Sequence, residues 1–179
     1  MWLYIRINLM IYLKISIGIF FSLLASRLIP HPPNFTSLIA LSFYVPAVLG
    51  TKFIPVVLIS FAITDAFLGF HSNLLFGWIS VVIIGLIAQF FKFSLFQRCG
   101  GVFIGAWIFY FLSNFGVWIN GMYGYSMNGL LLSYEMAIPF FYNTLVSTLI
   151  YSILIEIVIK VSKKNNFLSL YKNFFYKIG

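Results

Sequence analysis

Long apolar segments with almost no charged residues run along the whole chain and constrain its fold more than any other feature. A helix crosses the hydrocarbon core of a bilayer with about 20 residues at about 1.5 Å per residue. The apolar runs are continuous rather than alternating, which argues against the strands of a transmembrane barrel. We therefore predict an all-α polytopic membrane protein with six transmembrane helices, at residues 11–29, 35–50, 53–70, 75–91, 101–115 and 138–159.

The composition excludes other classes of protein. Of the 179 residues, 62% are hydrophobic and only 8% are charged, whereas about 25% of the residues of a typical soluble domain are charged. A soluble core of this size cannot hide so much apolar surface. We expect neither a soluble enzyme nor a disordered chain, but a single integral membrane domain over residues 1–179 whose partner is the lipid bilayer.

The basic residues predict the orientation of the helices. The chain has 11 Lys and Arg against 3 Asp and Glu, and only Arg27 falls on the outer side if both termini are cytoplasmic. This split fits the positive-inside rule, so we expect no nucleic-acid partner. Residues 161–179 form a basic and aromatic cytoplasmic tail, either solvated or lying as a helix on the inner leaflet. The ten inner basic residues are Arg6, Lys14, Lys52, Lys92, Arg98, Lys160, Lys163, Lys164, Lys172 and Lys177.

The connection after the first predicted span combines three prolines with polar side chains. Pro30, Pro32 and Pro33 prevent a helix there, because proline lacks the backbone N–H and fixes φ. We expect this stiff segment to hold His31 and Asn34 in fixed positions on the outer side. Asn34 also fits an N-cap of the next span, a position where asparagine is common.

Asp65 is the acidic residue that most needs an explanation. It lies about 20 Å along the helix axis from Lys52, in the outer third of the bilayer, and His71 ends the same segment. A carboxylate at that depth must face protein or a water-filled cavity. Two compatible interpretations stay open: contact with a ligand or cation, or an ion pair with Arg27.

The last two predicted spans add further polar and aromatic candidates on the outer side. Asn114 lies at the end of one span, and Asn143 lies one turn into the other and needs a buried hydrogen-bond partner. Trp118 and Tyr134 fit either an interfacial aromatic belt or the wall of a pocket. The four glycines within residues 116–129 predict a folded loop between the spans rather than one long helix.

Two features belong to helix interfaces or to the inner side. Gly18, Ser22 and Ser26 recur every four residues, and such a small-residue stripe permits close approach of helices, inside the molecule or against another protein. Glu156 lies four residues before Lys160, which predicts an ion pair along one helix.

The sequence shows no catalytic or metal-binding pattern. One cysteine and two histidines form no ligand cluster of the usual spacing, and no phosphate-binding loop is present. We expect no enzyme activity, no cofactor and no metal site. An intramembrane enzyme with His31 or His71 as a base beside Asp65 is the least favoured alternative, because no nucleophile accompanies them.

Four sequence blocks carry a resemblance to a known group of proteins. They resemble an uncharacterised family of small bacterial multi-pass membrane proteins, which is distantly similar to the substrate-binding S components of energy-coupling factor transporters. Departures from the family pattern are Ser37, Ser133 and the pair Ser147 and Thr148, which stands where the family often has Gly-Asp. The blocks are PHPPNFT at 30–36, TDAFLGFH at 64–71, SNFGVW at 113–118 and GLLLSYEMAIPFFYNTL at 129–145.

The resemblance implies six helices, cytoplasmic termini and a ligand pocket near the outer surface. S components line this pocket with their first, third and fifth loops, and small residues of helix one dock to a membrane coupling subunit that works with ATPases. The stripe Gly18, Ser22 and Ser26 is similar to such a docking surface. The candidate ligand-binding residues are His31, Asn34, Asp65, His71, Asn114, Trp118, Tyr134 and Asn143.

Residues and resemblance together predict an uptake component of the bacterial inner membrane. It binds a small ligand from the outer side, vitamin-like or cationic, with Asp65 setting the charge preference and separate subunits supplying the energy. The alternative is a non-transport structural or assembly protein of the inner membrane that acts through helix–helix contacts of its first span.

Overall fold

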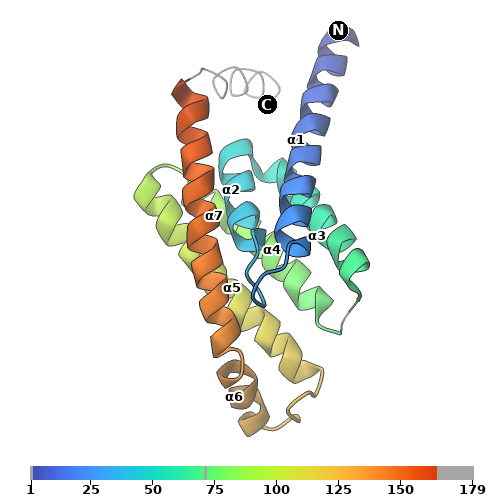
Figure 1. Ribbon diagram of the computed structural model, residues 1–179, viewed down its shortest axis with the longest axis vertical. Helices are drawn as coiled ribbons and strands as arrows, with labels where there is room; N and C mark the ends of the chain where they lie inside the picture. The colour runs from blue at the N-terminus through green and yellow to red at the C-terminus, as the bar shows by residue number, and fades with distance from the viewer. Residues whose placement is uncertain (1, 71, 165–179) are drawn as a thin grey trace.

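The computed structural model describes residues 2–70 and 72–164. Within them the chain forms seven α-helices and one short 3₁₀ helix, and no strand, so the expected all-α class is confirmed (Figure 1). In chain order they are α1 (Trp2–Leu28), α2 (Leu38–Leu49), the 3₁₀ helix η1 (Thr51–Phe53), α3 (Ile54–Leu68), α4 (Leu74–Ala88), α5 (Leu95–Ile119), α6 (Met127–Glu135) and α7 (Ile138–Lys164).

Four segments of the described chain are long and apolar enough to cross a membrane. The helices α2 and α4 have 12 and 15 residues, about 18 and 22 Å of helix, and fall short of that length. The membrane character is therefore supported, and four of the six expected spans have spanning length. The four are Met10–Leu28, Thr51–Leu68, Leu95–Ile119 and Ile138–Ser162.

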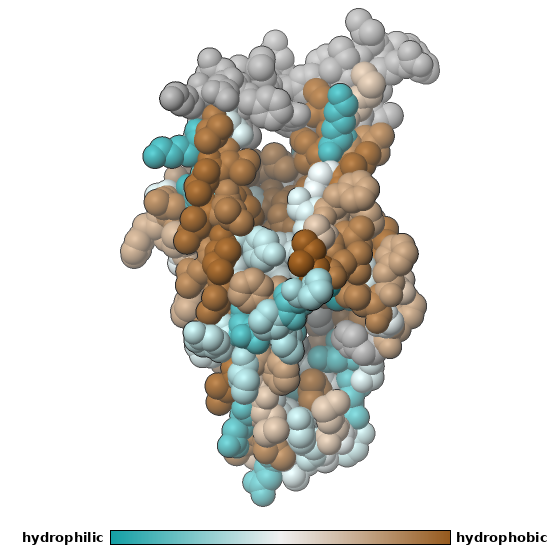
Figure 2. Space-filling model, in the orientation of Figure 1, coloured by the Kyte–Doolittle hydropathy of each residue, from teal (hydrophilic) through white to brown (hydrophobic). Residues whose placement is uncertain are grey.

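The helices run between two ends of an elongated molecule. In Figure 1, α1 begins and α7 ends at the upper end, while α6 and the α5–α6 connection lie at the lower end. Apolar side chains cover most of the upper half of the visible face, and hydrophilic side chains gather in the lower half (Figure 2). Large apolar side chains such as Phe96 (88% exposed) and Phe67 (72% exposed) face outward, as expected for contact with lipid.

The short helix α2 lies at the centre of the packing. Its residues Leu38–Pro46 are all buried, and it contacts α3, α4, α5 and α7. One face packs with α1 and α3 around Leu23 and Phe53, and the other packs with α4 and α5 around Phe43. An enclosed helix is shielded from lipid by its neighbours, so it does not need the length of a lipid-exposed span.

The helix α5 begins six residues earlier than the sequence predicts. The Ser94 side chain accepts a hydrogen bond from the backbone N–H of Gln97, and the Gln97 side chain accepts one from the backbone N–H of Ser94. This capping box satisfies two backbone donors at the helix start. Cys99 and Gly100 therefore lie inside the helix and not in the connection before it.

The connection between α5 and α7 is folded, as the glycines predict. Gly121 and Gly124 have φ values of +77° and +76°, which other residues rarely adopt. The turn that they form leads to Ser126, whose side chain accepts a hydrogen bond from the backbone N–H of Gly129 and starts the short helix α6.

The ion pair that Glu156 forms differs from the expected one. Glu156 on α7 binds Arg98 on α5 with two hydrogen bonds, 2.6 and 2.9 Å long, so the predicted pairing with Lys160 is wrong. A neighbouring helix presents the guanidinium in the two-pronged geometry that a carboxylate prefers, and such pairs are stronger than single-point contacts.

The small-residue stripe of α1 divides between two environments. Ser26 is buried and lies 2.7 Å from the Ser37 hydroxyl at the start of α2. Gly18 and Ser22 are exposed, and a β-carbon at Gly18 has no atom within 4 Å. The stripe therefore joins α1 to α2 only at Ser26.

Candidate functional site

A cavity of about 330 Å³ lies at the end of the bundle where α1 passes into α2. Its wall comes from α1, the α1–α2 loop, α2, α3, α4, α5 and α7, so segments far apart in the sequence contribute to one space. Apolar wall residues include Leu38, Ile39 and Phe109. The polar residues of the wall are Arg27, His31, Asn34, Thr36, Asn73, Ser113, Asn114 and Thr144.

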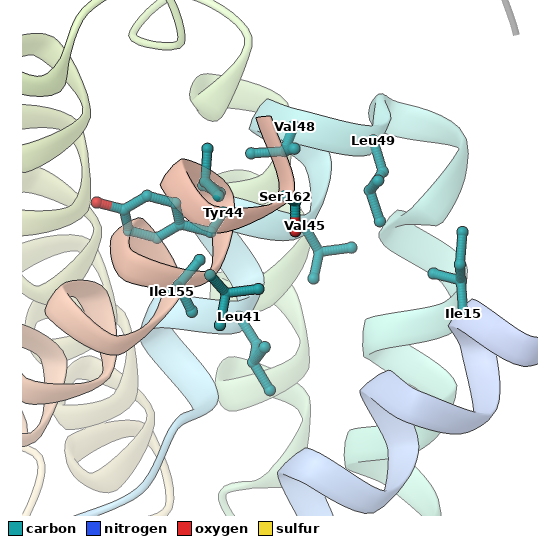
Figure 3. Close-up of a pocket in the computed structure, with 10 residues that line it drawn as sticks. Ile15, Leu41, Tyr44, Val45, Val48, Leu49, Ile155 and Ser162 are labelled. Carbon is teal, nitrogen blue, oxygen red and sulfur yellow. The ribbon is translucent and has the colours of Figure 1, made fainter. Parts of the chain in front are cut away.

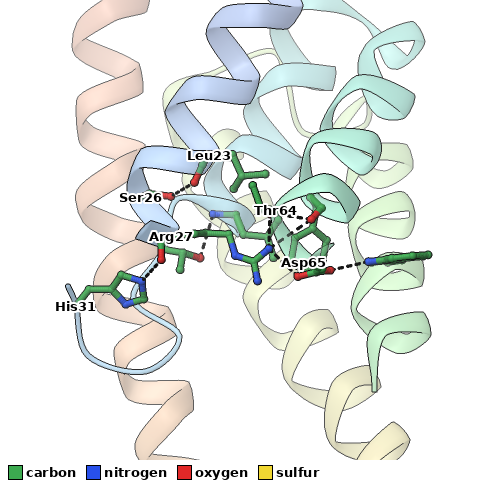
Figure 4. Close-up of polar contacts among 10 residues, drawn as sticks. Leu23, Ser26, Arg27, His31, Thr64 and Asp65 are labelled. Carbon is green, nitrogen blue, oxygen red and sulfur yellow. Dashed lines mark hydrogen bonds and ion pairs between the residues drawn. The ribbon is translucent and has the colours of Figure 1, made fainter. Parts of the chain in front are cut away.

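A buried ion pair lies at the α1 side of this cavity (Figure 4). Nη1 of Arg27 lies 2.7 Å from Oδ1 of Asp65, and the side chains are 14% and 1% exposed. The indole N–H of Trp78 on α4 donates a 2.8 Å hydrogen bond to Oδ2 of Asp65. The carboxylate thus joins α1, α3 and α4, and the ion-pair interpretation of Asp65 is the one that the structure shows.

Further contacts fix the guanidinium of Arg27. Nη1 also donates to the Thr64 hydroxyl and to the Phe61 carbonyl oxygen, and the guanidinium carbon lies 4.7 Å from the centre of the Phe61 ring. Within the described residues, Arg27 lines the cavity and Asp65 does not. The charge that faces the cavity is therefore positive, and its counter-charge lies behind it.

His31 lines the cavity from the proline-rich loop. Its Nδ1 lies 2.7 Å from the carbonyl oxygen of Pro32, and its Nε2 lies 3.3 Å from that of Arg27. Carbonyl oxygens only accept hydrogen bonds, and a neutral imidazole has a single N–H to donate. A neutral ring therefore donates to one of these carbonyl oxygens at a time, and the contact with the Arg27 carbonyl joins the loop to the end of α1.

Asn34 also lines the cavity, but it does not cap α2. Its φ of +63° lies in the left-handed region, which asparagine tolerates better than most residues, and Ser37 holds the N-cap position. The Asn143 amide on α7 donates a 3.0 Å hydrogen bond to the Pro33 carbonyl oxygen and so holds the loop against the bundle. The Pro33 carbonyl oxygen is therefore the hydrogen-bond partner of the Asn143 side chain.

The opposite wall is built by α4 and α5. The Asn73 amide donates a 2.7 Å hydrogen bond to the Ser113 carbonyl oxygen, and the Asn114 amide donates to the Tyr110 carbonyl oxygen at 2.7 Å. A β-carbon at Gly116 would overlap the Asn73 side chain. Glycine at this position therefore lets the start of α4 approach α5 closely enough to form the wall.

A smaller cavity of about 70 Å³ adjoins the first and shares Asn34, Ser113, Asn114 and Thr144 with it. The aromatic side chains of its wall are Phe109, Tyr110, Phe140 and Phe141. Together the two cavities place aromatic rings beside a set of amide and hydroxyl groups, as in sites for small organic ligands.

Two predicted aromatic residues lie elsewhere. Trp118 donates its indole N–H to the Ser126 carbonyl oxygen at 3.1 Å, and the Tyr134 hydroxyl donates to the Phe111 carbonyl oxygen at 3.1 Å. Both bonds fasten α6 and its loop to α5, and neither residue lines a cavity described above. Burial raises the pKa of Tyr134, and the nearby Tyr110 adds to this shift.

Comparison with known families identifies the group to which the chain belongs. Residues 8–170 match the family of unknown function DUF6580. The chain is a member of this family. No curated protein and no solved structure matches it. The expectation of an uncharacterised membrane-protein family is thereby supported in its coarse form, and the similarity to S components remains a proposal.

The structure brings His31, Asn34 and Asn114 together at one cavity, with Asp65 directly behind it. His71 lies outside the described residues. Sequence reasoning missed the cavity-lining roles of Arg27, Asn73, Ser113 and Thr144. Two signals were present: Ser113 and Thr144 belong to conspicuous sequence blocks, and Arg27 is the lone basic residue on the predicted outer side.

A further cavity of about 230 Å³ lies toward the opposite end, between α1, α2 and α7 (Figure 3). Its wall is almost entirely aliphatic, with Ile15, Leu41, Val45 and Ile155 among the residues (Figure 3), and Tyr44 is its aromatic member. This groove offers apolar contact and few groups that could orient a polar ligand.

Proposed function

We propose that the protein is a membrane uptake component that captures a small ligand in the cavity beside Arg27. The observation that carries the proposal is the convergence of polar side chains from five segments on one space of about 330 Å³, the size of known ligand sites. A cavity of this size suits a small organic molecule.

The proposed topology has six passes with both termini in the cytoplasm of a bacterial cell. α1 begins and α7 ends at one end of the molecule (Figure 1), and the basic residues flank that side of the helices. The short helices α2 and α4 complete the set of six because neighbouring helices shield them. This orientation makes the cavity accessible from outside the inner membrane.

The proposed energy source is a separate coupling subunit with ATPases, as in transporters whose S components the chain resembles. The support for this step is the sequence resemblance and the absence of a phosphate-binding loop from the sequence. The exposed residues Gly18 and Ser22 offer a surface on α1 that a helix of such a subunit can approach closely.

Native mass spectrometry of the detergent-extracted protein tests ligand capture. Gly77 lines the cavity, and a β-carbon there makes only ordinary contact with the Phe61 ring at 3.5 Å, so the β-carbon of Gly77→Val is accommodated and its two methyl groups add bulk at the cavity wall. We expect wild type to retain a small molecule and Gly77→Val to lose it. The control Leu75→Val changes a 65% exposed residue of the same helix and keeps the ligand. Absence of any small molecule from wild type contradicts the proposal.

The second candidate is a non-transport structural or assembly role through α1. The exposed Gly18 and Ser22 favour it, because small residues on a lipid-facing surface suit contact with a partner helix. Gly18→Leu separates the two functions, since a side chain there meets no atom of the protein itself within 4 Å of its β-carbon. If the protein has the assembly role, Gly18→Leu abolishes its function and Gly77→Val leaves that function intact.

A further inference from the structure

The charge presented to the outer cavity identifies the chemical class of its ligand. Among the described residues of the wall, Arg27 carries a permanent charge, and the other polar groups are amides, hydroxyls and an imidazole. Asp65 is 1% exposed and both of its oxygens already face donors, Nη1 of Arg27 and Nε1 of Trp78. A ligand entering the cavity therefore meets a guanidinium and no carboxylate.

The guanidinium retains donors for a ligand. Arginine has five N–H donors in a planar fork. Among the described residues, the side-chain hydrogen bonds of Arg27 and its closest contact with Asp65 are all made by Nη1. The remaining terminal nitrogen points away from Thr64 (Figure 4). Nε and Nη2 together form the edge of the fork that binds both oxygens of a carboxylate.

Asp65 acts as a positioning residue for Arg27. Its negative charge compensates the guanidinium, since an unpaired buried charge is strongly destabilising. Its bond to Trp78 fixes the carboxylate, and the carboxylate fixes Arg27 from the side opposite the ligand. The pair has no net charge, so one added negative charge suits the site better than the two charges of a phosphate.

We infer that the ligand of this cavity is a small monocarboxylic acid whose carboxylate binds Arg27 and whose uncharged body lies against the amides and aromatic rings of the opposite wall. The inference rests on the proposed function and replaces the expectation of a cationic ligand set by Asp65. Asn114, Ser113 and Thr144 are in position to bind uncharged polar groups of the body, and Phe109 belongs to both cavities and offers an apolar surface.

The test uses probes of similar size that differ in charge. Benzoate, benzamide and benzylamine share a ring and carry charges of −1, 0 and +1 at neutral pH, and nicotinate with its amide and amine gives a second set. Thermal unfolding of the purified protein in detergent, followed by tryptophan fluorescence, reports binding as a rise in Tm. We expect the acids to stabilise wild type and the amides and amines to have no effect.

Two variants link this preference to the ion pair. In Asp65→Asn the guanidinium of Arg27 loses its counter-charge, while the side-chain oxygen of the new Asn still accepts the hydrogen bond from Trp78. We therefore expect acids to bind this variant at least as tightly as wild type. Arg27→Gln/Asp65→Asn keeps a neutral, hydrogen-bonding pair and folds without a buried charge. Its affinity for acids falls at least about tenfold, because charge-assisted hydrogen bonds are lost.

The outcomes separate the inference from the proposed function. Stabilisation by the amines, or loss of binding in Asp65→Asn, overturns the inference. A neutral or cationic molecule retained by wild type in native mass spectrometry also overturns it and leaves ligand capture standing. If wild type retains no small molecule and responds to none of the six probes, both fail.

Discussion

The ion pair between Arg27 and Asp65 makes a quantitative prediction about stability. The Arg27 side chain is only 14% exposed. Asp65→Leu removes the carboxylate and so leaves the guanidinium of Arg27 without its counter-charge. It also deprives the Trp78 indole of its acceptor. Breaking a buried pair in this way costs about 3–5 kcal/mol. Since Arg27 borders a cavity that water can enter, we expect the lower end, about 3 kcal/mol, which is roughly a 100-fold change in the unfolding equilibrium.

A double-mutant cycle isolates the ionic contribution. Arg27→Met leaves Asp65 as the unpaired charge and costs a similar amount, whereas Arg27→Met/Asp65→Leu contains no buried charge and costs far less than the sum of the single changes. We expect a coupling energy of at least about 2 kcal/mol. The measurement is equilibrium unfolding in mixed micelles of mild detergent and dodecyl sulfate, followed by tryptophan fluorescence.

A neutral contact on the same helix supplies the control. Ser26 and Ser37 are buried and their hydroxyls lie 2.7 Å apart, so Ser26→Ala removes a hydrogen bond between α1 and the start of α2 without removing a charge. Hydrogen bonds between membrane helices contribute about 0.6 kcal/mol on average. If the Arg27 and Asp65 variants are additive within about 0.5 kcal/mol, the reasoning about this pair is refuted.

Three further predictions concern the architecture. Gly116→Ala drives a methyl group into the first turn of α4 and lowers stability by about 1–3 kcal/mol, whereas Gly100→Ala, whose β-carbon meets open space, is neutral or stabilising by thermal unfolding. Ser94→Ala removes the capping box of α5 and costs about 1 kcal/mol; an unchanged unfolding midpoint contradicts this. In a cysteine-free protein, an impermeant maleimide labels Met122→Cys in intact cells and Phe93→Cys only in inverted vesicles; the reverse pattern overturns the proposed orientation.

The clustering of polar residues at the connections between apolar segments was predictable, because prolines and amides interrupt the apolar runs there. Which of these residues share a cavity was not predictable. The Trp118 side chain turns toward its own loop, and Asn143 binds the loop before α2 over a separation of 110 residues. The angle at which each helix faces its neighbours decides such contacts, and a uniformly apolar helix carries little periodic signal for that angle.

The capping box of α5 is a case in which the local signal was present in the sequence. A serine followed three residues later by glutamine marks a helix start, and Ser94 and Gln97 have that spacing. The apolar run begins later, at residue 101, so a reading based on hydropathy alone shortens the helix. Hydropathy reports contact with lipid, whereas the helix extends as far as its backbone hydrogen bonds are satisfied.

By itself, the sequence determined the helical membrane class, the family and the segments in which the polar residues cluster, because these follow from composition and local pattern. Only the tertiary structure decided that Asp65 lies behind Arg27 and that Arg27 faces the cavity. Likewise, only the tertiary structure showed that Glu156 pairs with Arg98, 58 residues away, and not with the nearby Lys160. The physical reason is that a buried charge must find its partner wherever packing brings one within reach, and packing between helices is a property of the folded chain as a whole.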